Sequence, residues 1–77
     1  MAKHIHFELF VRRGAARSWS LHDAIESRQD ALDAAKAQMA SGLVTAVRVV
    51  KETFDDATND FRSVVILEDG NLKKIAL

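Results

Sequence analysis

Residues 27–42, SRQDALDAAKAQMASG, decide the fold, because they are the one stretch of the chain that carries both helix-start and helix-stop signals. Ser27 followed three positions later by Asp30 resembles an N-cap, in which the serine oxygen accepts a hydrogen bond from a free backbone N–H. The residues that follow are rich in alanine and contain no β-branched side chain. Apolar residues recur at helical spacings of three and four: Leu32, Ala35 and Met39. Because Gly42 can adopt the left-handed conformation that ends a helix, we predict one amphipathic helix over residues 28–40.

The chain before this helix carries the pattern of a β-strand followed by a turn. Over residues 3–12 apolar side chains occupy every second position: Ile5, Phe7, Leu9 and Val11. This period of two is expected of a strand with one buried face, so residues 3–12 are predicted to form the first strand. Gly14 lies among small and charged residues over 13–17, which favours a hairpin connection.

A second strand is predicted over residues 19–25. Its large apolar residues share one parity: Trp19, Leu21 and Ile25. The competing interpretation starts a long helix at Ser20 and carries it to Ser41. We favour the strand because the capping pattern at Ser27 indicates a later helix start.

Two further strands are predicted after the helix. Residues 43–54 are rich in β-branched side chains, which favour strands. Residues 55–60, DDATND, are turn formers, and residues 61–67 resume an apolar, β-branched pattern. The sequence therefore predicts a second hairpin, and the tail over 72–77 is too short to assign.

The predicted fold is a single α+β domain over residues 1–77, with the element order ββαββ. One helix packed on one face of a four-stranded antiparallel sheet is the economical arrangement for these elements. We expect the strand order 2-1-3-4, because the first strand is the most apolar and belongs inside the sheet. This order also lets the helix cross between the second and third strands in the right-handed sense.

Composition excludes several classes of protein. The 77 residues are 48% hydrophobic and 29% charged, as in an ordinary globular protein. Eleven basic and eleven acidic side chains leave no net charge, so no global field attracts nucleic acid or an anionic membrane. The absence of cysteine agrees with a cytoplasmic protein, and no apolar run approaches the ~18–20 residues that span a bilayer.

Groups that carry catalysis or bind metals are sparse. His4 and His6 lie two apart on a predicted strand and share a face, but a third ligand would have to come from His22 or a carboxylate. The acidic loop over 55–60 lacks the central glycine and the distal glutamate of a calcium-binding loop. No serine lies in a nucleophile-elbow pattern. We therefore expect no catalytic residues, no cofactor and no metal.

One basic cluster surrounds the first hairpin, and it contains Arg12, Arg13, Arg17 and Trp19. Arginines beside an aromatic ring can hold a phosphate and stack a base, so a small nucleic-acid-binding domain is the alternative function. The same residue types are enriched in protein-binding hot spots, and a solvated hairpin explains them as well.

The predicted sheet has more apolar residues than one helix can cover. The leading functional hypothesis is based on this excess. If the first strand faces the helix with its odd-numbered residues, the opposite face of the sheet carries apolar side chains, which we assign to Phe10, Val50, Val64 and Ile66. Exposed apolar patches mark interfaces, and edge strands offer a second route to association. We expect a non-catalytic protein-interaction or oligomerisation module, with a protein partner or a second copy as its ligand and no membrane contact.

Overall fold

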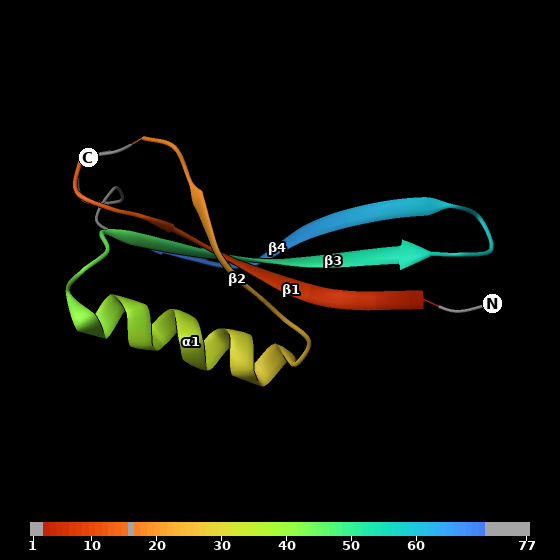
Figure 1. Ribbon diagram of the computed structural model, residues 1–77, viewed down its shortest axis with the longest axis horizontal. Helices are drawn as coiled ribbons and strands as arrows, with labels where there is room; N and C mark the ends of the chain where they lie inside the picture. Colours follow the sequence, from red (N-terminus) through yellow and green to blue (C-terminus); the bar gives the residue numbers. More distant parts are fainter. Residues whose placement is uncertain (1–2, 16, 71–77) are drawn as a thin grey trace.

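The computed structural model describes residues 3–15 and 17–70 and confirms the predicted ββαββ order. Its elements are β1 (Lys3–Arg12), β2 (Ser20–Ile25), α1 (Arg28–Ser41), β3 (Ala46–Asp55) and β4 (Asp60–Gly70). The strands form one sheet in the order β2-β1-β3-β4, and every neighbouring pair is antiparallel. Figure 1 shows α1 on one side of this sheet, so the molecule has two layers.

Both ends of α1 follow from local sequence. The Ser27 side chain accepts a hydrogen bond from the Asp30 N–H at 3.2 Å, as the capping pattern predicts. At the other end Gly42 has φ 76°, and its N–H donates to the Met39 carbonyl at 3.3 Å. The helix therefore runs between its predicted start and stop signals.

The core lies between α1 and the face of the sheet that carries the odd-numbered residues of β1. Its buried members are Phe7, Leu9, Val11, Ala31, Ala35, Val44, Val47 and Val49. The two helical members are alanines, and their small side chains let the helix backbone approach the sheet closely. The larger side chains that fill the space come from β1 and β3, so the two central strands provide most of the apolar burial.

Two strand limits differ from the sequence-based expectation by three residues, and three others differ by one residue. β3 begins at Ala46 rather than Leu43, because Ala46 pairs with Arg12, the last residue of β1. The Thr45 N–H, just before the strand, donates to the Arg12 carbonyl at 2.8 Å. β4 continues to Gly70 rather than ending at Leu67, because its last residues still pair with the first residues of β3. The predicted tail over 72–77 lies outside the described residues.

The helix covers only part of the sheet. The molecule measures 44 × 23 × 18 Å, and its long axis is the strand direction. In Figure 1, β1, β3 and β4 extend past the start of α1 toward the N-terminal end of β1. We call this extension the distal arm; it comprises residues 3–6, 52–55 and 60–63.

Candidate functional site

The candidate site is the sheet face opposite α1, which we call the open face. Beyond the end row of Arg12, Ala46 and Gly70, cross-strand pairing arranges its side chains in four rows. The first row, nearest the C-terminal end of α1, contains Leu21, Phe10, Arg48 and Glu68. The second row contains Ala24, Glu8, Val50 and Val65. The third row contains His6, Glu52 and Ser63, and the fourth row, in the distal arm, contains His4, Phe54 and Phe61. Within the described part of the chain no second layer covers these rows.

A β-bulge corrects two of the predicted face residues. Leu67 lies opposite Val49 and Val65 lies opposite Val50, so Ile66 is an extra residue in β4. Without the bulge, Val50 would face Ile66, and Val64 would lie two residues further along on the same side. The extra residue reverses the parity: Val64 lies opposite Lys51 on the helix side of the sheet, and Ile66 packs against the core. The expectation that Val64 and Ile66 share the open face with Phe10 is therefore wrong.

Val65, Leu21 and Phe61 are the exposed large apolar side chains of the open face. Their exposed fractions are 51%, 56% and 63%. The predicted Val50 does lie on this face but is only 8% exposed, because the neighbouring rows surround it. The sequence analysis did not single out these three residues, since a bulge in β2 and another in β4 decide which side chains turn outward.

A polar row divides the open face. Glu52 is only 9% exposed, and the Ser63 hydroxyl lies 2.8 Å and 2.9 Å from its two carboxylate oxygens. In the adjacent strand His6 Nε2 lies 3.3 Å from a carboxylate oxygen of Glu8. The Ser63 hydroxyl thus donates a hydrogen bond to the carboxylate of Glu52, which the neighbouring side chains bury.

Aromatic rings form the last row, at the tip of the distal arm. The His4 and Phe54 rings stack with centroids 6.2 Å apart, and Phe54 and Phe61 are 5.8 Å apart. His4 Nε2 also lies 2.9 Å from a carboxylate oxygen of Asp56. His4 and His6 share a face, as the sequence predicts, but among the residues that the structure describes no three histidine, aspartate or glutamate side chains converge on one point.

Two guanidinium groups lie over the Trp19 ring beside the first row. The Cζ atom of Arg48 is 4.4 Å from its ring centroid and that of Arg12 is 5.0 Å away, both within cation–π range. Arg48 also donates to Glu68 at 3.0 Å. The predicted pair Arg12 and Trp19 is thus close in space. Sequence reasoning missed Arg48, because only the β1–β3 register places it beside Phe10.

The other two arginines of the predicted hairpin cluster, Arg13 and Arg17, are exposed. Within the described residues neither contacts the Trp19 ring. The structure therefore does not bring the four predicted residues into one cluster. It replaces them with a smaller group made of one tryptophan and two arginines from neighbouring strands.

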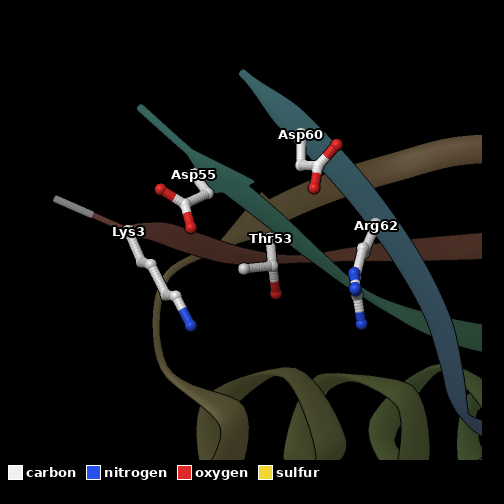
Figure 2. A pocket seen from close by; sticks show the side chains of 5 residues that line it. All are labelled: Lys3, Thr53, Asp55, Asp60 and Arg62. Atoms are coloured by element: carbon white, nitrogen blue, oxygen red, sulfur yellow. The ribbon is translucent and has the colours of Figure 1, made fainter. Parts of the chain in front are cut away.

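A polar hollow lies on the opposite side of the distal arm, the side of α1. It measures about 200 Å³ and is lined by Lys3, Thr53, Asp55, Asp60 and Arg62. Figure 2 shows that the Lys3 and Arg62 side chains extend in the same direction, with Thr53 between them. Two cations and two carboxylates cancel one another here, so the hollow has no excess charge with which to attract an ion.

Comparison of the chain with protein-family models, curated proteins and solved structures found no match. None of the helices that the structure describes is long and apolar enough to cross a membrane.

Proposed function

We propose that this chain is a non-catalytic protein-interaction module that binds a protein surface through the open face. The observation that carries the proposal is an uncovered sheet face on which Leu21, Val65 and Phe61 are each more than half exposed. An antiparallel sheet can leave one face in water when that face is polar, but here apolar side chains lie in the first, second and fourth rows. Burying them against a partner removes apolar surface from water, which favours association.

The composition near the first row also supports protein binding. Trp19, Arg12 and Arg48 lie together beside the exposed Leu21, and tryptophan and arginine dominate the hot spots of protein interfaces. The cation–π contacts hold these long side chains in place before binding, so less side-chain entropy is lost on association. The module is proposed to act in the cytoplasm, where a cysteine-free chain of this composition is typical.

The test compares charged substitutions on and off the open face. Leu21→Lys and Phe61→Lys should each abolish or strongly weaken retention of partners in affinity capture from the source cells. Leu43→Lys is the matched control, because Leu43 is 74% exposed in the loop after α1 and does not belong to the open face. If both open-face variants retain the same proteins as the control, or if the wild type retains none and is a monomer in light scattering, the proposal is wrong.

The nucleic-acid alternative remains a prediction with weaker support. A base stacked on Trp19 would compete with the two guanidinium groups that already lie over its ring. A fluorescence-anisotropy titration at low salt tests it, and absence of binding to both single- and double-stranded nucleic acid would remove it.

A further inference from the structure

β4 is a long edge strand whose centre carries neither a charged residue nor a proline. It is 11 residues long, and β3 is its one neighbour in the described sheet. Its centre, residues 64–67, is VVIL, four apolar residues without a charge or proline. Val64 and Val65 are 54% and 51% exposed, one on each face. Such an edge offers both unpaired backbone groups and apolar side chains to a further strand.

The bulge at Ile66 determines which side chains of β4 share a face. Before the bulge Arg62 and Val64 lie on the helix side, opposite Thr53 and Lys51 of β3. After the bulge Leu67 and Asp69 lie on the same side, opposite Val49 and Val47. Arg62 and Asp69, seven residues apart, therefore project from one face, whereas an unbroken strand would place them on opposite faces.

With this arrangement β4 is complementary to itself. Consider two β4 strands that pair in the antiparallel direction about a two-fold axis between residues 65 and 66. Val64 then lies opposite the partner's Leu67, and Arg62 lies opposite the partner's Asp69. Apart from the pair of Val65 and Ile66 at the axis, side chains then meet side chains on the same side of the sheet, and symmetry forms each contact twice. Phe61 lies opposite the partner's Gly70, where an aromatic ring can cover a residue without a side chain.

The charges of β4 disfavour one of the two registers that differ from this one by two residues. A shift by two residues that moves the two-fold axis toward the start of β4 would place Asp60 opposite the partner's Asp69, and these like charges would repel. Arg62 and Asp69 are both exposed. Within the part of the chain that the structure describes, neither side chain takes part in a hydrogen bond or ion pair with another residue. Both are therefore available to a partner.

We propose that two copies of this chain pair through antiparallel β4 strands, with Arg62 opposite the partner's Asp69, and join their two four-stranded sheets into one continuous sheet. The inference rests on the proposed function, because it names a second copy as one protein that the module binds. Exposed ion pairs contribute little affinity, so backbone pairing and the burial of Val64 and Leu67 supply the attraction and the charges fix the register.

The experiment measures the dissociation constant of the dimer by sedimentation at several protein concentrations and low salt. Arg62→Asp and Asp69→Arg should each raise it about tenfold or more, because each places like charges opposite one another twice. The double variant R62D/D69R exchanges the charges and should restore it to within about threefold of the wild-type value. Asp23→Arg, which reverses an exposed aspartate on the opposite edge strand β2, is the matched control and should change nothing.

The possible results separate this inference from the proposed function. A wild type that is monomeric at every concentration overturns β4 pairing. The proposal is also wrong if both single charge reversals leave the dimer intact, or if the double variant does not restore dimerisation. A dimer that Asp23→Arg weakens would instead pair through β2. Where β4 pairing fails, the open-face proposal is judged separately by Leu21→Lys, because Leu21 lies on β2 at the opposite edge of the sheet from β4. Phe61→Lys does not separate the two proposals, because Phe61 also lies in the proposed β4 pair.

Discussion

Gly70 occupies a position at the end of β4 where the backbone of β3 leaves no room for a side chain. A Cβ atom added there would collide with the Cβ of Ala46, and it would lie 2.9 Å from the Ala46 Cα and 3.0 Å from the Thr45 carbonyl oxygen. Two of these three atoms belong to the backbone, so a side chain cannot be accommodated by a change of rotamer alone. The close approach lets β4 pair with β3 up to its last residue.

We therefore expect Gly70→Ala to lower the free energy of unfolding by about 1–3 kcal/mol, the usual cost of overpacking. Urea denaturation followed by circular dichroism measures the change. Gly14→Asn is the control, since Gly14 has φ 56° with open space around it and asparagine tolerates the left-handed conformation. Equal stability of Gly70→Ala and the wild type would show that the end of β4 moves away from Ala46.

Among the elements, α1 depends on its caps more than a typical amphipathic helix does. Its fully buried residues are Ala31 and Ala35, which bury little apolar area. The Ser27 side chain satisfies one of the backbone N–H groups that the first turn leaves without a partner. We expect Ser27→Ala to lower the free energy of unfolding by about 1 kcal/mol, measured by urea denaturation.

The control for this change is Ser18→Ala, at an exposed serine in the loop before β2. It should leave the urea midpoint unchanged. If Ser27→Ala is equally silent, water replaces the serine oxygen at the first turn and the cap does not stabilise the helix.

The elements also show why sequence predicted the fold better than the site. β1 and α1 were predicted because alternation, capping and the stop glycine at Gly42 are local signals. The face of Val64 could not be predicted, because a bulge is decided by how β4 packs against β3 and has no local signal of its own in VVIL. Arg48 was missed for a related reason, since its contact with Trp19 joins residues that lie far apart in the chain.

At the scale of the whole molecule, the sheet is supported unequally along its length. One half of β1 and β3 packs on α1 and contains Leu9 and Val49, which are fully buried. The other half forms the distal arm, where Ile5 on the helix side is 44% exposed and Phe61 on the open face is 63% exposed. The arm therefore relies on strand pairing and surface contacts, whereas the covered half also gains from the burial of the core.

This difference predicts unequal local stability within single strands. Hydrogen exchange followed by NMR should show the Ile5 amide exchanging at least about tenfold faster than that of Leu9, a difference in opening free energy of about 1.4 kcal/mol. The same contrast should appear in β3 between Thr53 and Val49. Equal protection along both strands would mean that the arm opens only when the whole molecule unfolds. It would also show that the pairing of β1, β3 and β4 stabilises the arm as strongly as the helix stabilises the covered half.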